Sequence, residues 1–163
     1  MNVKDLMARW PAAVRPNDGL DEAMALMHER ECGCLPVVDA GSQVLGIVTD
    51  RDVALAALRT RKALSALAVH DAWHEGAFTC RPDDTIAEAE RLMGQHQVRR
   101  LPVVDADGRL QGLLSLDEIA REAFREESLT VHPISAQAVG ITLGQICRPR
   151  LILDVATEEI RKV

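Results

Sequence analysis

The feature of this sequence that most limits its possible folds is an internal repeat. The hexapeptide LPVVDA occurs at residues 35–40 and again at 101–106. With that 66-residue offset, residues 3–58 align with 69–124 without a gap, and 18 of the 56 aligned pairs are identical. A gapless match of this length indicates two copies of one structural unit.

The extent of the match predicts how the chain divides. We expect a first copy at residues 3–66, a second copy at 67–127 and a C-terminal extension at 128–163. Within the extension, the pattern predicts a helix over 134–147 and then a strand or apolar docking segment at 151–156.

Both copies show the same succession of hydrophobic patterns. Apolar residues recur at the spacing of one helix face, at Leu20, Ala23, Leu26 and Met27 and again at Ile86, Ala89, Leu92 and Met93. Two short apolar runs joined by a turn rich in Asp, Gly and Ser then predict an antiparallel hairpin. In the first copy we expect a strand near 13–14, a helix from 20, strands at 35–38 and 44–48, and a helix at 51–64. The corresponding elements of the second copy are a strand near 79–80, a helix from 86, strands at 101–104 and 110–114, and a helix at 117–127.

The size of one copy predicts how the two are arranged. A unit of this length buries only about 60% of its extended surface and is marginally stable alone. Packing the two copies against each other relieves that shortage, so we expect an α+β fold in which two β-α-β-β-α repeats form a pseudo-twofold pair with a cleft between them. Hydrophobic residues make up 47% of the chain, with only two Trp, two Phe and no Tyr, so the core must be aliphatic.

Composition also argues against several classes of protein. The net charge of −6 is opposite to the basic footprint of a nucleic-acid binder. No apolar run approaches the length of about 20 residues that spans a membrane, and the N-terminus does not resemble a secretory signal. The spacing of the four cysteines fits neither a zinc knuckle nor a thioredoxin motif, which favours free thiols in a cytoplasmic protein. His70 and His74 are expected to be ordinary surface histidines, with no metal site.

The repeated pattern resembles the CBS domain, and specifically the tandem pair known as the Bateman module. The resemblance rests on PNDGLDEAMALM, on CGCLPVVDAGSQVLGIVTDRDVA and on their second-copy counterparts. It implies a regulatory module, here as a stand-alone chain, that binds AMP, ADP, ATP or S-adenosylmethionine between the repeats and modulates a partner protein. Such pairs often form homodimers.

The stretch GIVTDRD at residues 46–52 is the principal candidate for a binding site. Thr49 ends a buried strand and begins a helix, where backbone N–H groups and the helix dipole suit a phosphate. Asp52 offers two acceptors, which suit the cis-diol of a ribose, and the resemblance assigns these same roles to the two residues. The spacing also fits a capping box that needs no ligand. The repeat and Gly46 favour the binding role, and both roles are compatible.

The second copy departs from this motif. It reads GLLSLDE, so Ser115 keeps the hydroxyl group while Glu118 replaces the expected Asp or Asn. Because the extra methylene displaces the carboxylate, we expect two unequal sites, with the first dominant.

Further candidates come from residues beside the strands. Arg99 and Arg100 precede the second LPVVDA, and basic residues at this point of the family often meet ligand phosphates; two solvated arginines are the alternative. By resemblance, Val14, Cys34 and Pro36 line an adenine slot, although strand packing explains them equally well.

No catalytic arrangement can be assigned from the sequence, so we expect a non-enzymatic sensor without a catalytic cofactor. A ligand-free structural or dimerisation module is the alternative. We expect a homodimer that forms through the apolar faces of the helices that end each copy, at 51–64 and 117–127. The apolar residues of these faces are Val53, Ala54, Ala57 and Leu58 in the first copy and Ile119, Ala120, Ala123 and Phe124 in the second.

Overall fold

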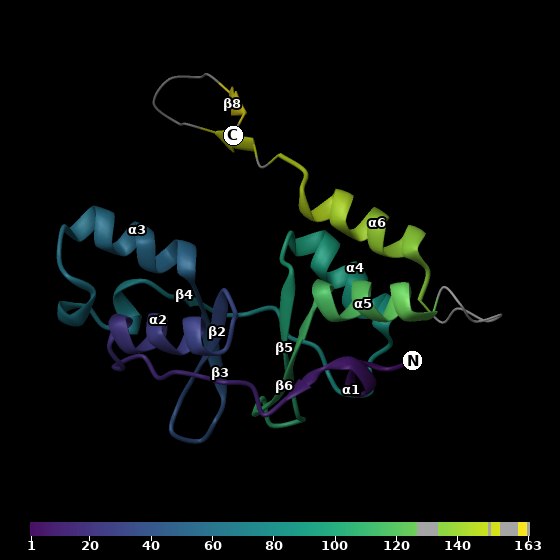
Figure 1. Ribbon diagram of the computed structural model, residues 1–163, viewed down its shortest axis with the longest axis horizontal. Coiled ribbons are helices and arrows are strands. Elements are labelled where there is room, and N and C mark those ends of the chain that lie inside the picture. The colour runs from purple at the N-terminus through teal and green to yellow at the C-terminus, as the bar shows by residue number, and fades with distance from the viewer. Residues whose placement is uncertain (127–133, 150, 154–159, 163) are drawn as a thin grey trace.

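The computed structural model describes residues 1–126, 134–149, 151–153 and 160–162. It confirms the predicted α+β fold, with the first copy on one side and the second on the other (Figure 1). The first copy contains α2 (Leu20–Glu29), β2 (Cys34–Val38), β3 (Val44–Thr49) and α3 (Asp50–Thr60). The second contains α4 (Ile86–His96), β5 (Arg100–Val104), β6 (Leu110–Ser115) and α5 (Leu116–Glu126). Within the described residues, no helix is both long enough and apolar enough to cross a membrane.

The two predicted hairpins are present and match each other in register. Cys34 lies opposite Thr49 in the β2–β3 hairpin, and Arg100 lies opposite Ser115 in the β5–β6 hairpin. Each hairpin has an irregularity at the equivalent position, between the two valines of its LPVV segment. The repeat in the sequence therefore corresponds to a repeat in backbone geometry.

The strand expected ahead of each first helix is reduced to a single bridge. Val14 bridges Val37 in the first copy, and Cys80 bridges Val103 in the second, both in parallel. The Val14 N–H donates to the Pro36 carbonyl at 3.0 Å, and the Cys80 N–H makes the equivalent bond to Pro102 at 3.1 Å. Those two hydrogen bonds hold the chain beside the hairpin without forming a longer strand.

The third strand of each sheet is supplied by a segment that the sequence did not reveal. Strand β4 (His74–Glu75) pairs with β3, giving the order β2-β3-β4, and β1 (Ala8–Arg9) pairs with β6, giving β1-β6-β5. Strand β1 belongs to the N-terminal segment, and β4 to the segment that connects the copies. The sheet of the first copy is therefore completed by the segment that precedes α4, the first long helix of the second copy. The sheet of the second copy is completed by the segment that precedes α2.

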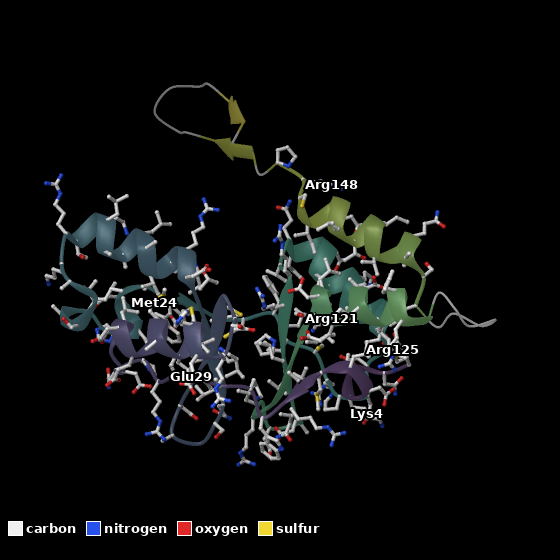
Figure 2. All side chains as sticks on the ribbon, in the orientation of Figure 1. Lys4, Met24, Glu29, Arg121, Arg125 and Arg148 are labelled. Atoms are coloured by element: carbon white, nitrogen blue, oxygen red, sulfur yellow. The ribbon has the colours of Figure 1, made fainter. Side chains whose placement is uncertain are left out.

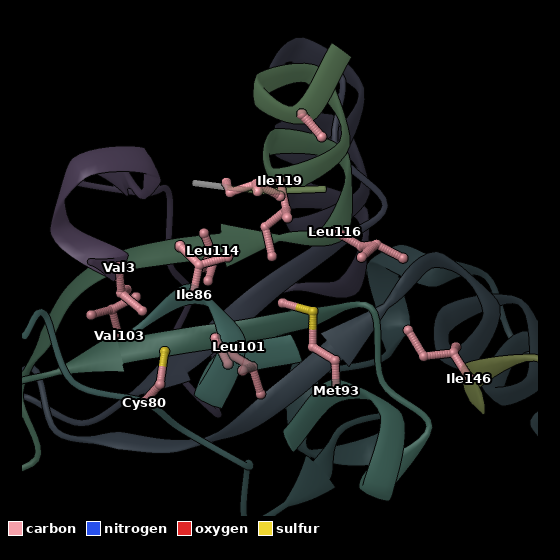
Figure 3. Close-up of a cluster of buried hydrophobic side chains, with 13 residues drawn as sticks. Val3, Cys80, Ile86, Met93, Leu101, Val103, Leu114, Leu116, Ile119 and Ile146 are labelled. Atoms are coloured by element: carbon pink, nitrogen blue, oxygen red, sulfur yellow. The ribbon is translucent and has the colours of Figure 1, made fainter. Parts of the chain in front are cut away.

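The short helices next to these strands follow the same exchange. Helix α1 (Val3–Leu6) lies on the second copy, where Val3 is fully buried among that copy's core residues (Figure 3). The 3-10 turn η2 (Val69–Asp71) lies on the first copy, and Val69 is fully buried there. A further turn, η1 (Leu64–Ala66), packs near α2.

Reciprocal hydrogen bonds relate the two copies by a pseudo-twofold axis. The Val44 N–H donates to the Gly108 carbonyl at 3.1 Å, and the Leu110 N–H donates to the Ser42 carbonyl at 2.9 Å. Each bond becomes the other when its residues are shifted by one repeat. The hairpin turns of the two copies thus pair directly with each other.

Both cores are aliphatic, as the composition predicts, and they correct part of the expected dimer surface. Val53, Ile119 and Ala123 belong to the cores and are buried, so they cannot form an interface. The large apolar side chains that α3 and α5 leave exposed are Leu55, Leu58 and Phe124. Leu58 is 73% exposed and Phe124 79% exposed.

The extension begins with the expected helix, α6 (Ala136–Ile146), which packs on α4 and α5. The Ser135 hydroxyl caps it by accepting a hydrogen bond from the Ala138 N–H at 3.0 Å. Strands β7 (Leu151–Leu153) and β8 (Ile160–Lys162) then pair antiparallel, which bears out the strand interpretation for residues 151–153. The remainder of the predicted 151–156 segment lies outside the described residues.

Candidate functional site

Thr49 and Asp52 are joined by a closed network at the start of α3. Asp52 Oδ2 accepts from the Thr49 N–H at 3.0 Å and from the Thr49 hydroxyl at 2.6 Å. The Asp52 N–H donates back to Thr49 Oγ1 at 3.2 Å. This is a complete capping box, so the capping interpretation holds. The Asp52 side chain is only 12% exposed.

The three residues expected to line an adenine slot lie together beside this network. Val14, Cys34 and Pro36 are all buried, Cys34 lies opposite Thr49, and Val14 is hydrogen-bonded to the backbone of Pro36. Burial raises the pKa of the Cys34 thiol to about 11, against a smaller opposing effect of the Arg100 guanidinium. The thiol is therefore neutral at physiological pH, so all three side chains are uncharged.

The structure corrects the expectation that the first N–H groups of α3 are free to bind a phosphate. The Asp50 N–H donates to the Gly33 carbonyl at 3.1 Å, and the Arg51 N–H donates to Asp50 Oδ1 at 2.7 Å. Because the Asp52 N–H is engaged by Thr49, the first three amides of the helix all have partners. Asp50 also places a negative charge there, so the helix start alone is a poor phosphate site.

The two arginines of the second copy differ in their surroundings. Arg100 is partly buried, with its side chain 28% exposed, and approaches Asp117 at 3.6 Å. Its guanidinium opposes the rise in the pKa of the Cys34 thiol, which belongs to the other copy. Arg99 is exposed, and its carbonyl accepts from the Leu116 N–H at 2.9 Å. Of the two, Arg100 is the better placed to meet an anion between the copies.

The second motif forms the same closed cap with a longer side chain. Glu118 Oε2 accepts from the N–H of Ser115 at 2.7 Å and from its hydroxyl group. Glu118 Oε1 accepts from Arg121, one turn further along α5, at 3.2 Å (Figure 2). The glutamate is therefore folded back into the cap, as Asp52 is in the first copy, and is paired with an arginine of its own helix.

A histidine of β4 contacts the carboxylate of the first-copy motif. His74, on β4, lies with its Nε2 3.0 Å from Asp52 Oδ1. The sequence predicts that His70 and His74 are both ordinary surface histidines; His70 contacts the Pro16 carbonyl and Asp71 and not Asp52. A separation of 22 residues gives no sequence signal for the His74–Asp52 contact.

Two grooves lie near the repeat helices, and neither is lined by Thr49 or Asp52. One, of about 390 Å³, is lined by Met24, Met27, His28, Glu31, Cys32, Gly33 and Asp50 (Met24 is labelled in Figure 2). Because Gly33 and Asp50 adjoin Cys34 and Thr49 in the chain, this groove borders the candidate site. The other, of about 460 Å³, lies between α4 and the end of α6. The described part of the chain holds no group of three metal-ligating side chains, and its four cysteines are unpaired.

Comparison with known proteins assigns the family. A family model of the CBS domain matches residues 3–59 and 74–125, which together cover more than half of the chain. The chain therefore belongs to the CBS domain family, as the resemblance of its two motifs implies.

Similar proteins include both short chains and segments of enzymes. The CBS domain-containing protein YhcV of Bacillus subtilis is 35% identical over 127 residues, covering 78% of this chain and 89% of that protein. The structure of CBSX2 from Arabidopsis thaliana, solved in complex with AMP, matches with a TM-score of 0.67 and 30% identity, covering 76% of this chain and 96% of that one. An inosine-5'-monophosphate dehydrogenase of Korarchaeum cryptofilum is 35% identical over 76% of this chain, which spans only 23% of the enzyme.

Proposed function

We propose that the protein is a non-enzymatic regulatory module that binds an adenosine nucleotide between its two copies, chiefly at the first-copy motif. The observation that carries the proposal is the Thr49–Asp52 pair at the end of β3, with the buried, uncharged residue Cys34 opposite Thr49. A carboxylate suits a ribose diol, and uncharged side chains such as Val14, Cys34 and Pro36 suit a purine. The AMP complex of the similar protein CBSX2 supports the same ligand class.

Within this proposal, each candidate residue has a separate role. Asp52 accepts hydrogen bonds from the ribose hydroxyl groups, and the Thr49 hydroxyl turns from Asp52 towards the phosphate. Arg100 supplies the positive charge that the start of α3 lacks, with exposed Arg99 as a secondary phosphate contact. Ser115 belongs to the second site, which is weaker because the extra methylene of Glu118 displaces the carboxylate.

We further propose that the module acts as a homodimer on a client protein. Leu58 and Phe124 are large apolar side chains left exposed on α3 and α5. Exposed apolar residues of this size on repeat helices suit a contact with a second copy. A nucleotide bound between the repeats would change how these helices are presented.

The alternative is a structural module that binds no ligand. It is favoured by the capping boxes of Thr49 and Ser115, which are both closed and need no ligand to satisfy the helix starts.

Thermal melting with AMP, ADP, ATP and S-adenosylmethionine separates the two functions. A ligand at 100 times its dissociation constant adds about 2.7 kcal/mol to the free energy of unfolding, which is a clear rise in melting temperature. Guanosine monophosphate and ribose 5-phosphate serve as controls for the base. If no adenosine ligand raises the melting temperature at millimolar concentration, the structural module is the better account.

A further inference from the structure

The contact between His74 and Asp52 joins the candidate site to the segment that connects the two copies. The His74 imidazole is 71% exposed, whereas the Asp52 carboxylate is 12% exposed. Because a carboxylate only accepts hydrogen bonds, His74 donates from Nε2 to Asp52 Oδ1 across the 3.0 Å between them. With Thr49 on the other oxygen, the carboxylate is held from both sides.

The backbone brings His74 to this place by a close approach that needs a glycine. In the β3–β4 pair, Ile47 lies opposite His74 and Gly46 lies opposite Glu75. A Cβ atom on Gly46 would collide with the His74 carbonyl oxygen, so any other residue at this position would force β4 to move. The glycine of the GIVTDRD motif thus makes room for β4, and β4 presents His74 to Asp52.

This arrangement is specific to the first copy. The position equivalent to His74 is Ala8, which pairs with Leu113 in β6 and has no group to donate to Glu118. Glu118 instead pairs with Arg121, whose first-copy counterpart is Leu55. The two carboxylates therefore have partners of different chemistry and from different segments.

The hydrogen-bond capacity of Asp52 is compatible with His74 remaining in place when a ribose binds. An ionised carboxylate has about four acceptor positions. In the structure, Thr49 uses two of these positions on Oδ2 and His74 uses one on Oδ1. When the Thr49 hydroxyl turns to a phosphate, one position is open on each oxygen. A cis-diol needs two acceptors placed in this way.

We infer that His74 is a positioning residue of the nucleotide site, which fixes the Asp52 carboxylate so that each oxygen keeps one acceptor for the ribose diol. This inference rests on the proposed function, because it takes Asp52 as the ribose-binding group. It adds that the connecting segment between the copies is part of the site.

The test is calorimetric titration of AMP into the full chain and three single variants. His74→Ala removes the donor, His74→Gln keeps an N–H donor near the position of Nε2, and His70→Ala removes a histidine of the same segment that does not contact Asp52. We expect His74→Ala to weaken AMP binding by roughly threefold to tenfold, as for the loss of one hydrogen bond. His74→Gln should recover most of the affinity, and His70→Ala should bind as the wild type does.

The outcomes distinguish this inference from the proposal on which it rests. If the wild type binds AMP and His74→Ala binds it equally well or more tightly, the inference is overturned while the proposed function stands. Equal weakening by His74→Ala and His74→Gln would also overturn it, because the donor would then not be what matters. If the wild type binds no AMP, both fail. Melting temperatures of the variants, measured in parallel, verify that the exposed substitutions leave the fold intact.

Discussion

Thr49 and Ser115 each have a structural role as helix caps that does not depend on a ligand. Their hydroxyl groups accept from the third amide of the following helix, and their own amides donate to the carboxylate at that position. Thr85 and Glu88 form the same closed box at the start of α4, away from the candidate site. The same local geometry therefore recurs at the starts of α3, α4 and α5, and only its surroundings can make one of these helix starts a binding site.

A pair of threonine variants separates capping from binding. Thr49→Ala and Thr85→Ala each remove a cap, so each should lower the free energy of unfolding by about 0.5–2 kcal/mol. Only Thr49→Ala should also weaken AMP binding, because Thr85 has no place in the site. Denaturant unfolding and AMP titration measure the two effects. Equal AMP affinity in both variants would remove Thr49 from the site.

Glu90 predicts a pH dependence of stability. It is buried on α4, accepts from the Thr142 hydroxyl at 3.3 Å, and has its pKa raised above 4.5 by burial. The native state therefore binds the proton more tightly than the unfolded chain does, so this residue's contribution is complete below pH 4.5 and is lost as pH rises through the folded pKa. Glu90→Gln should melt higher than the wild type near neutral pH, with the difference vanishing in acid.

Glu88 is the matched control, because hydrogen bonds from Thr85 lower its pKa. Its contribution is present above the unfolded pKa of 4.5 and is lost as pH falls. Glu88→Gln should therefore change the melting temperature in the opposite direction near neutral pH. Melting curves across this range measure both, and a higher melting temperature for Glu88→Gln would contradict the assignment.

Among the elements, the exchanged strands β1 and β4 make the two copies interdependent. Gly46 and Gly112 occupy equivalent positions and leave room for these two strands. A Cβ atom on Gly46 would meet the His74 carbonyl, and one on Gly112 would meet the Met7 side chain at 2.5 Å. The repeated glycine of the motif thus has a packing role in both copies, whatever the ligand.

Gly46→Ala should therefore destabilise the protein by about 1–3 kcal/mol, because β4 must move to admit the methyl group. Gly140→Ala is the control: Gly140 is in α6 with open space around it, and alanine there should stabilise the helix by up to about 1 kcal/mol. Chemical denaturation measures both. Equal stability of wild type and Gly46→Ala would mean that β4 does not approach as closely as described.

Across the whole molecule, the elements that recur in both copies could be predicted from the sequence, whereas the strands and contacts that link one copy to the other could not. The helices, the hairpins and the α6 cap could be predicted because periodicity, turn residues and Ser135 are local signals. The two-residue strands β1 and β4 have no pattern of their own, and their pairing depends on contacts far along the chain. The His74–Asp52 contact and the burial of Ile119 were missed for the same reason.

The proposed homodimer can be tested on the exposed apolar residues that remain. Leu58→Glu and Phe124→Glu place charges on α3 and α5, and either should shift a dimer to monomers in light scattering. Trp10→Ser is the control, since Trp10 is also exposed but lies outside these helices. A wild-type chain that is monomeric at high micromolar concentration contradicts the dimer.

The most direct test of the central claim is calorimetric titration of AMP into wild type, Asp52→Ala and Glu118→Ala. One dominant site per chain is expected. Asp52→Ala should weaken it ten- to a hundredfold, since losing a hydrogen bond to a charged group costs about 1.5–3 kcal/mol. Glu118→Ala should bind nearly as the wild type does. Binding that survives Asp52→Ala but is abolished by Glu118→Ala would place the site in the other copy, and a wild type that binds no AMP at millimolar concentration would contradict the account altogether.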